Sequence, residues 1–569
     1  MTHHPLFVAV GRVQRLVVRA LTMGLAAGAL TGALTGCGGG GGGGGSSSSS
    51  GSSSSGSGST AVQGTLSLGL LGGASRNVDH VWVTVSAVAM HAQTTQAWSS
   101  SDSSWTVVQL NTPAVIDLTA TAASQSDMSN VVKQLSVSPG TYAQLRLFPL
   151  AHDAALHSAA SAKGLSYNAQ VDYTDAQGHA HSVPLELPSP ELGWRIARSF
   201  TVSASTAVSL AVEADLQHSL VRLSANDGLD HFTFRPQLQS YNLSTLGAIL
   251  GVIDVASICG GTGASTAPNC ATDIVVSAQR LSADGSRYVS VRQSKVGSDG
   301  YFNLYPLPGD AQYDVVITGR RMQTMVVKAV DNLTVLSSPT HPIYPVLAPN
   351  ASRTVNLASA MSPSSSQLFF GQTLSSGGKP YEVAVGNVDP FTGLMAQDLS
   401  LPEGPVSLAT YNVRVTDMNF VDTVPQQGSE AFSVQALGAA YDDAGAVSTQ
   451  VPPARTSSTI TVGNPTRQAG LGTGQIQVTV NGTLSSAYDK AQLLISDVNG
   501  VVATQGLSGA GSTSITVPAG SQAAALGGTA VYSVALRASG AGGGLKWVRA
   551  TNVVDLRSSA SASVTLTLP

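Results

Sequence analysis

The sequence predicts an all-β protein, in which several β-sandwich domains follow one another after a signal peptide and a disordered Gly/Ser tether. Three observations support this fold class. Apolar and polar residues alternate at a period of two in segment after segment. Asp-Gly and Asn-Gly turn dipeptides separate these segments. Only 11% of the residues are charged, against about 25% in globular proteins, and Val and Thr are abundant, which disfavours a helical bundle.

The composition also bears on the class of function. Nucleic-acid binding requires clustered Lys and Arg, whereas the net charge here is −4. The sequence contains no P-loop, no His-Glu-x-x-His and no Gly-x-Ser-x-Gly at a strand–turn–helix junction. We therefore expect no enzyme, no cofactor and no nucleic-acid partner. A Ser/His/Asp triad stays open, because its members are distant in sequence.

Residues 1–36 have the layout of an export signal. Arg12, Arg15 and Arg19 form a positively charged segment, and an uncharged stretch of apolar and small residues follows from Ala20 to Leu34. This stretch has the length of a signal-peptide core rather than of a comfortable membrane span. We expect it to be removed on export.

The signal ends in Leu34-Thr35-Gly36-Cys37, which resembles the lipobox of bacterial lipoproteins. The resemblance implies diacylation of Cys37 on sulfur, cleavage before it and acylation of the new amine, with palmitate as a typical chain. The alternative is an ordinary signal with a chance cysteine. Gly38, where inner-membrane lipoproteins carry Asp, implies the outer membrane. The implied partner is thus the lipid bilayer, reached through the acyl chains of Cys37.

Residues 37–62 contain the acylated cysteine and a Gly/Ser linker that cannot bury a core. About 500 residues follow, enough for three to five domains. Period-two alternation is clear in Val81-Val83-Val85, Val208-Leu210-Val212, Ile476-Val478-Val480 and Val564-Leu566-Leu568. One short helix is expected around Ser124 to Leu135, where apolar residues have helical spacing.

The first domain, residues 63–242, contains a set of recognisable stretches. They are Gly64–Leu68, Val78–Val85, Ile116-Asp117-Leu118, Pro139–Leu147, Leu187-Pro188-Ser189, Glu213–Leu216 and Arg235-Pro236. Together they resemble the bacterial family called domain of unknown function 4382, which is common in lipoproteins. The Pro139-Gly140-Thr141-Tyr142 stretch is the most specific. The sequence departs from the family at Gly72–Ser75, where Asp-Ala-Pro is frequent, and at Glu213, where Asp is common. The resemblance implies no known activity.

The second domain, residues 246–350, resembles a carboxypeptidase-regulatory-like or transthyretin-like sandwich, a carbohydrate-binding-like fold. The resemblance rests on Ser298–Phe302, Leu307-Pro308-Gly309 and Tyr313–Thr318. Asp299-Gly300 predicts a tight hairpin turn, after which Phe302 and Leu304 point into the core. Such folds host starch-binding modules, but a fold does not confer that activity.

Residues 351–467 and 468–569 are expected to form two further immunoglobulin-like sandwiches. Cys259 and Cys270 are the cysteines besides Cys37. In an oxidising compartment such a pair predicts a disulfide. A metal site is disfavoured there, because two cysteines without a nearby histidine offer too few ligands.

Trp98 and Trp105 flank a Ser-rich segment, which predicts an exposed loop with two aromatic rings. Exposed rings offer a platform for a sugar or a protein partner. The alternative is that the rings belong to the core, and for Trp98 the two interpretations are balanced.

The sequence offers two weak candidate metal sites, and no metal is expected. His179 and His181 share one face of a strand, and with His152 and His157 they could bind zinc if the four imidazoles converge. We favour two solvent-facing histidines in a hairpin that begins at Gly178. Glu213 and Asp215 also share a face and could join a calcium site or pair with Arg146. We favour a solvated strand face for them.

The leading hypothesis is a non-catalytic, outer-membrane-anchored lipoprotein that presents β-sandwich modules for adhesion, scaffolding or partner binding. The alternative is a carbohydrate-binding envelope protein. Whether the modules face the periplasm or the cell exterior is left open.

Overall fold

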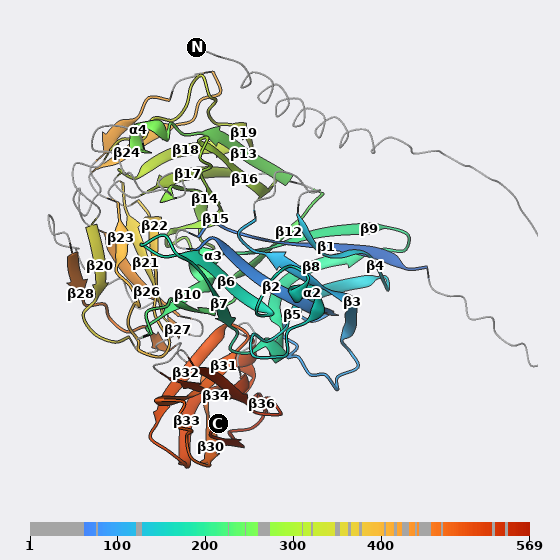
Figure 1. The fold of residues 1–569 in the computed structure, drawn as a ribbon. Coiled ribbons are helices and arrows are strands. Elements are labelled where there is room, and N and C mark those ends of the chain that lie inside the picture. Colours follow the sequence, from blue (N-terminus) through green and yellow to red (C-terminus); the bar gives the residue numbers. More distant parts are fainter. Residues whose placement is uncertain are drawn as a thin grey trace, which may run out of the picture. The chain divides into compact units, whose positions relative to one another are not determined.

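A computed structural model of the chain shows an almost entirely β protein (Figure 1). It describes residues 62–75, 78–120, 128–225, 227–244, 246–259, 273–309, 311–319, 322–347, 353–361, 366–374, 378–402, 405–414, 418–423, 432–438, 441–442, 457–467, 470–525, 530–540 and 544–569. Within these residues the α-helices are short, at four to six residues, and one 3₁₀ helix spans Pro190–Leu192. None of them is long and apolar enough to cross a membrane.

The first sandwich consists of two sheets. Its strands are β1 (Gly64–Gly72), β2 (His80–His91), β3 (Thr106–Asp117), β4 (Ser129–Val137), β5 (Gly140–Pro149), β6 (Ala169–Thr174), β7 (Ala180–Glu186), β8 (Trp194–Val202), β9 (Ala207–Ala214), β10 (Leu220–Leu223), β11 (His231–Phe234) and β12 (Leu238–Asn242). One sheet has the order β12-β9-β1-β4, and the other the order β10-β11-β7-β6-β2-β5-β8, with β3 paired to β2. Two short helices, α2 (Ser158–Ser161) and α3 (Leu216–Ser219), lie between strands.

The alternation predicted for β2 is confirmed. Val81, Val83 and Val85 are fully buried in the core of the first sandwich. Trp82 points to the other face, where its indole Nε1 donates to Asp172 Oδ2 at 2.9 Å. The β-branched side chains thus supply one apolar face, as a sandwich requires.

The helix predicted from Ser124 to Leu135 is wrong where the structure describes it. Residues 129–137 form β4, which pairs antiparallel with β1. A β-bulge near Leu66–Leu68 shifts the register, and Val131 and Val132 are both buried. An irregular strand places apolar residues at uneven spacing, which imitates the period of a helix.

The second sandwich contains β13 (Leu246–Val252), β14 (Val275–Leu281), β15 (Tyr288–Lys295), β16 (Tyr301–Pro308), β17 (Gln312–Thr318), β18 (Met325–Asp331) and β19 (Leu333–Val335). A turn forms at Asp299-Gly300, and Phe302 and Leu304 are buried as predicted. The predicted hairpin is wrong, because the turn joins β15 to β16, which belong to different sheets. Gly300 has a φ of +84°, and a Cβ there would lie 2.2 Å from the carbonyl oxygen of Ile253. Only glycine fits this turn.

The third sandwich contains β20 (Arg353–Leu357), β21 (Gln367–Gln372), β22 (Tyr381–Asn387), β23 (Leu399–Leu401), β26 (Ser433–Leu437), β27 (Tyr441–Asp442), β28 (Ser457–Ile460) and β29 (Thr466–Arg467). Two strands from the same stretch of chain, β24 (Val406–Thr410) and β25 (Val421–Thr423), instead extend the sheet of the second sandwich. β24 pairs parallel with β18. The expectation that residues 351–467 form one separate sandwich is therefore wrong for this segment, because strand pairing between distant segments is not encoded locally.

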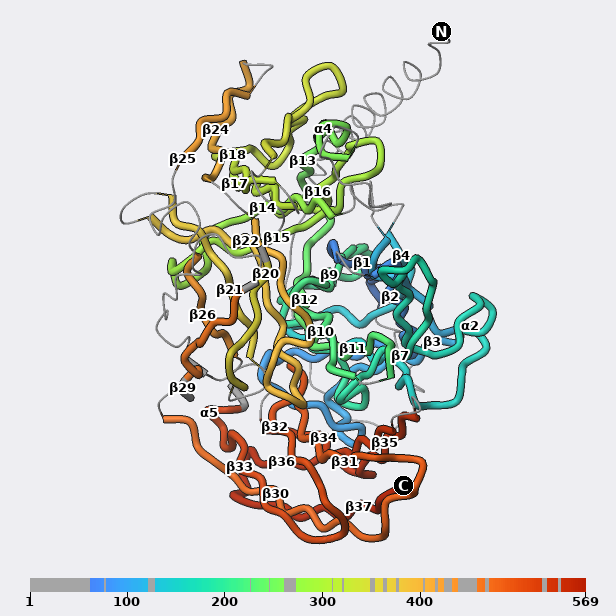
Figure 2. Tube along the Cα trace, turned by 60° about the vertical axis from the view of Figure 1, so that its left-hand side comes forward, coloured from blue at the N-terminus to red at the C-terminus, as the bar shows by residue number. Residues whose placement is uncertain are grey.

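The fourth sandwich contains β30 (Gly472–Asn481), β31 (Lys490–Asp497), β32 (Gly500–Leu507), β33 (Gly511–Ala519), β34 (Val531–Ser539), β35 (Leu545–Arg549), β36 (Val554–Asp555) and β37 (Ser561–Thr567). A helix, α5 (Gly520–Ala525), follows β33. Ile476, Val478 and Val480 are buried in its core, as their alternation predicts. Figure 2 shows the red strands of this sandwich beside the third and first sandwiches.

Candidate functional site: the junctions of the first sandwich

The first sandwich is joined to each of the other three by buried polar side chains. Its contact residues lie on β7, β9 and β10 and around α3. Buried charges are expensive unless they are paired and hydrogen-bonded. The pairs described below therefore require the sandwiches to stay in contact.

At the junction with the second sandwich, Arg292 of β15 pairs with Glu213 of β9. The guanidinium Nη1 lies 2.6 Å from Glu213 Oε1 and 2.9 Å from the carbonyl oxygen of Gly72. Arg292 is 1% exposed and Glu213 is 3% exposed. The hydroxyl of Tyr241 lies 2.8 Å from Glu213 Oε2. Burial raises the pKa of Glu213, and Arg292 offsets only part of this effect.

At the junction with the third sandwich, an imidazole lies between two carboxylates. Asp215 caps α3 and its Oδ2 lies 2.7 Å from His218 Nδ1, while His218 Nε2 lies 3.2 Å from Glu382 Oε2 of β22. Glu382 Oε1 also accepts from Ser290 Oγ of the second sandwich at 2.7 Å. Burial opposes the charge on His218, but the carboxylates outweigh it and hold its pKa well above 6.5. This cluster thus joins three sandwiches.

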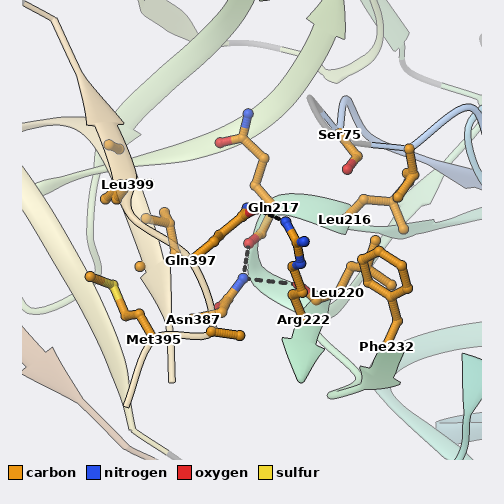
Figure 3. A pocket seen from close by; sticks show the side chains of 15 residues that line it. Ser75, Leu216, Gln217, Leu220, Arg222, Phe232, Asn387, Met395, Gln397 and Leu399 are labelled. Carbon is orange, nitrogen blue, oxygen red and sulfur yellow. Dashed lines mark hydrogen bonds between the residues drawn. The ribbon is translucent and has the colours of Figure 1, made fainter. Parts of the chain in front are cut away.

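A cavity of about 130 Å³ adjoins this cluster (Figure 3). Arg222 of β10 donates to Gln397 of the third sandwich and to Asp230. Asn387 at the end of β22 donates to the carbonyl oxygens of Gln217 and Leu220, at 2.7 and 3.0 Å. Arg222, Asn387 and Gln397 thus already bond across the junction, which favours a structural role for this cavity.

At the junction with the fourth sandwich, Arg537 of β34 forms a bidentate ion pair with Glu186 of β7. The guanidinium Nε and Nη2 lie 2.6 and 2.7 Å from the two carboxylate oxygens. Glu186 is fully buried, which acts to raise its pKa, but Arg537 outweighs burial and lowers the pKa. Arg537 also stacks over the ring of Phe391 from the third sandwich, 4.6 Å from its centroid.

His152 lies beside this junction in a cavity of about 240 Å³ between the first and fourth sandwiches. Its Nδ1 accepts from the Leu187 backbone amide at 3.0 Å, and its ring contacts Trp547 edge-on. Burial lowers the pKa of His152 from 6.5 to about 4. The imidazole is therefore neutral at pH 7 and carries its proton on Nε2.

We expect this histidine to make the protein acid-sensitive. The unfolded chain takes up the His152 proton near pH 6.5, whereas the folded chain resists until about pH 4. The stabilisation is therefore complete above pH 6.5 and is lost as the pH falls to 4, by about 3 kcal/mol. Asn at position 152 can still accept from the Leu187 amide. Urea unfolding at pH 7 and pH 4 should show a smaller acid loss in His152→Asn, and an unchanged loss in the exposed control His179→Asn. An equal loss in all three proteins would contradict the assignment.

The structure corrects the premise of the Trp98–Trp105 ligand surface. Trp105 is buried, 5% exposed, and its Nε1 donates to the Ala97 carbonyl oxygen at 3.3 Å. Trp98 is half-buried and packs on Trp105 and on Phe148. The polar segment between them turns on itself through Asp102, whose carboxylate accepts from the Ser104 amide and whose carbonyl oxygen accepts from the Trp105 amide. The predicted exposure of the two rings is therefore wrong, and with it the reason to place a ligand surface there.

The predicted hairpin forms, but only one of its two histidines faces solvent. Asp175 and Gly178 make the turn between β6 and β7, and Gly178 has a φ of +88°. His179 is exposed and His181 is half-buried against Tyr173. Both imidazoles bond to the same Asp175 oxygen, at 3.1 and 2.9 Å. These bonds hold the pKa of Asp175 well below its ordinary value.

For Glu213 and Asp215 the predicted solvated face is wrong. Both are buried, and Glu213 pairs with Arg292 rather than with Arg146. Arg146 instead donates to the Leu192 carbonyl oxygen and to Gln144. Among the described residues, no group of three His, Cys, Asp or Glu side chains is arranged to hold a metal ion.

The predicted acylation and disulfide involve residues that the structure does not describe. Cys37 and Cys270 lie outside the described residues, and Cys259 ends α4 (Ala256–Cys259). Acylation of Cys37 and the Cys259–Cys270 disulfide therefore stay predictions. Mass spectrometry of the non-reduced, alkylated protein decides the second.

The junction residues were missed by sequence reasoning. Glu186, His218 and Arg537 carry no motif, and their partners are distant in the chain. One signal was available: each is a charged or titratable residue in or beside an apolar, strand-like run of a protein that has few charges. Such a residue is rarely buried without a partner.

Comparison with known proteins gives a family-model match to one part of the chain. Solved structures that align with it include the TIE protein of Bacillus anthracis, at 8% identity over 86% of this chain and 68% of that one, with a TM-score of 0.15. The tetra-tandem repeat of a large adhesion protein aligns at 11% identity over 86% of this chain and all of that one, with a TM-score of 0.10. Scores this low establish no common fold. A search of curated proteins gives no match. Residues 63–236, which make up most of the first sandwich, match the model of the family described as domain of unknown function DUF4382.

Proposed function

We propose that the chain is a non-catalytic lipoprotein of the cell envelope, in which the first sandwich holds the other three in fixed positions to form one composite binding surface. The observation that carries this proposal is the set of buried ion pairs between sandwiches. Glu213–Arg292 and Glu186–Arg537 each place a charge from the first sandwich against one from another. Such pairs disfavour independently moving sandwiches, because each charged side chain would lose its partner when two sandwiches separate.

Anchoring is supported by the sequence around Cys37. A cysteine that follows small residues and an apolar signal core fits acylation, and two or more acyl chains give stable attachment to a membrane. Gly38 supports the outer membrane as the destination. The Gly/Ser segment that follows would hold the sandwiches away from the bilayer.

The anchor is tested by Cys37→Ser. A hydroxyl cannot form the thioether, so the variant should leave the membrane fraction after a high-salt wash, whereas the wild-type protein stays in it. The control Cys259→Ser keeps Cys37 and should remain membrane-bound. Retention of Cys37→Ser in washed membranes would place the anchor elsewhere.

The location of the binding surface is tested by protease shaving. Trypsin added to intact cells should degrade the sandwiches if they face the exterior, and only after permeabilisation of the outer membrane if they face the periplasm. A chain that is recovered in the cytoplasmic fraction would overturn the envelope role.

A further inference from the structure

One face of the second sandwich is apolar and uncovered. The sheet β16-β13-β19 (Figure 1) turns its inner face to the sandwich core, where Ile249, Phe302 and Thr334 are buried. Its outer face carries Leu333 and Val335 of β19, each 58% exposed. Neighbouring residues of a strand point to opposite faces, so these two aliphatic side chains lie on the side away from the core.

The strand register makes this outer face continuous. Leu333 pairs with Ala248 and Val335 pairs with Leu250, so four apolar side chains of two neighbouring strands lie side by side. Ala248 and Leu250 are half-buried. Single exposed aliphatic residues are ordinary on a protein surface, but a continuous group of them marks a contact site.

Two tyrosines flank the end of β13 on the same face. Tyr301 of β16 pairs with Val252 and is 38% exposed. On the other side of β13, Ile343 bridges to Ile253 and is buried, so the next residue, Tyr344, points outward and is 62% exposed. Tyrosine suits a boundary between an apolar phase and water, because its ring is apolar and its hydroxyl is polar.

The outer face is uncharged and its rim is acidic. β13, β16 and β19 contain no charged residue. Asp254 follows the end of β13 by two residues, Asp299 precedes β16 by two, and Asp331 precedes β19 by two. An apolar face with carboxylates around it is complementary to a surface that has an apolar interior and outward-facing cations.

The size of the face disfavours a stable contact with another protein. Three strands spaced at about 4.8 Å and the seven residues of β13 at about 3.3 Å each cover roughly 300 Å². Contact with a partner would bury roughly twice this area in total, which is below the ~1,000 Å² of a specific protein interface. A weak contact of this size is sufficient only for a chain that is already held beside its partner.

The proposed anchor would hold the face close to lipid. A Gly/Ser segment of the length that follows Cys37 reaches roughly 25–30 Å as a coil, so the sandwiches can approach the bilayer as well as stand away from it. Attachment through such a segment gives a local concentration in the millimolar range, at which a weak contact is populated.

We propose that the outer face of the sheet β16-β13-β19 lies against the membrane that anchors Cys37, with Leu333 and Val335 inserted among the lipid headgroups. The acidic rim would face the ammonium groups of zwitterionic lipids. This inference rests on the proposed anchoring and deepens it, because it assigns the surface that meets the bilayer. The contact is weak by itself, since its strength scales with the buried apolar area, and it would not retain Cys37→Ser in washed membranes.

The test uses the mature chain from residue 37 with Cys37→Ser, so that neither the signal nor an acyl chain contributes. It is floated with phosphatidylcholine vesicles at up to about 10 mM lipid, and the bound fraction should rise with lipid. Leu333→Asp with Val335→Asp should lower the partition coefficient roughly tenfold or more. The control Leu281→Asp with Val421→Asp makes the same changes at exposed positions of the other sheet and should bind like its parent. Added phosphatidylglycerol should weaken binding.

A milder variant keeps the test decisive if the double variant does not fold, which a thermal melt detects. Tyr344→Ser should weaken vesicle binding roughly 3- to 10-fold. No binding at about 10 mM lipid, or equal binding by the Leu333/Val335 variant and its control, overturns the inference. A dimer in analytical ultracentrifugation that the Leu333/Val335 variant lacks also overturns it, because the face then meets a second copy. Failure of the anchor is seen separately, as retention of Cys37→Ser in washed membranes.

Discussion

Glu186→Gln is expected to destabilise the contact between the first and fourth sandwiches by about 3–5 kcal/mol, because it leaves the buried Arg537 guanidinium without its counter-charge. Glu186 is fully buried and Arg537 is 9% exposed, so water cannot replace the lost partner. The amide has nearly the same shape as the carboxylate, so the loss reports charge rather than packing. Chemical unfolding followed by tryptophan fluorescence should show a separate early transition, in which the fourth sandwich is released.

A matched control and a rescue separate this effect from general damage. Glu191 lies a short distance along the chain and is exposed, so Glu191→Gln should change stability by less than about 0.5 kcal/mol. The double variant Glu186→Leu with Arg537→Met replaces the pair by apolar groups and should recover most of the stability. If Glu186→Gln unfolds like Glu191→Gln, the two sandwiches are not held together by this pair.

Arg292→Met should cost about 3–5 kcal/mol at the junction of the first and second sandwiches. The change strands Glu213 in the interior and frees the carbonyl oxygens of Gly72 and Tyr305, which Arg292 otherwise bonds at 2.9 Å each. Glu213 is then expected to take up a proton, so the loss should be smaller at pH 5 than at pH 8. Unfolding midpoints in urea at both pH values measure this.

The control for this second prediction is Arg280→Met on the neighbouring β14. Arg280 is exposed and stacks over Tyr313, so its loss should cost under about 1 kcal/mol. A double-mutant cycle with Glu213→Gln isolates the coupling between Arg292 and Glu213. Additive single effects in that cycle would contradict the pairing.

Local features of the sequence determined the strands and turns of this protein. The alternation in β2 and β30 predicted which side chains enter the cores, because neighbouring residues of a strand point to opposite faces. The turn at Asp299-Gly300 could also be predicted locally, because a tight turn needs a residue with a positive φ and Gly300 supplies it. The wrong helix prediction at β4 shows the limit of such local reasoning, because a β-bulge breaks the period-two alternation by which a strand is recognised.

Only the tertiary structure decided which polar faces meet water. Period-two alternation separates an apolar face from a polar one, but it cannot tell whether a second sandwich covers the polar face. Glu213 meets Arg292 across 79 residues, and Glu186 meets Arg537 across 351. β24 joins the sheet of another sandwich by the same kind of distant pairing. These contacts arise from packing between separately patterned segments, and the free energy that fixes them lies in the burial of both partners, which neither segment encodes alone.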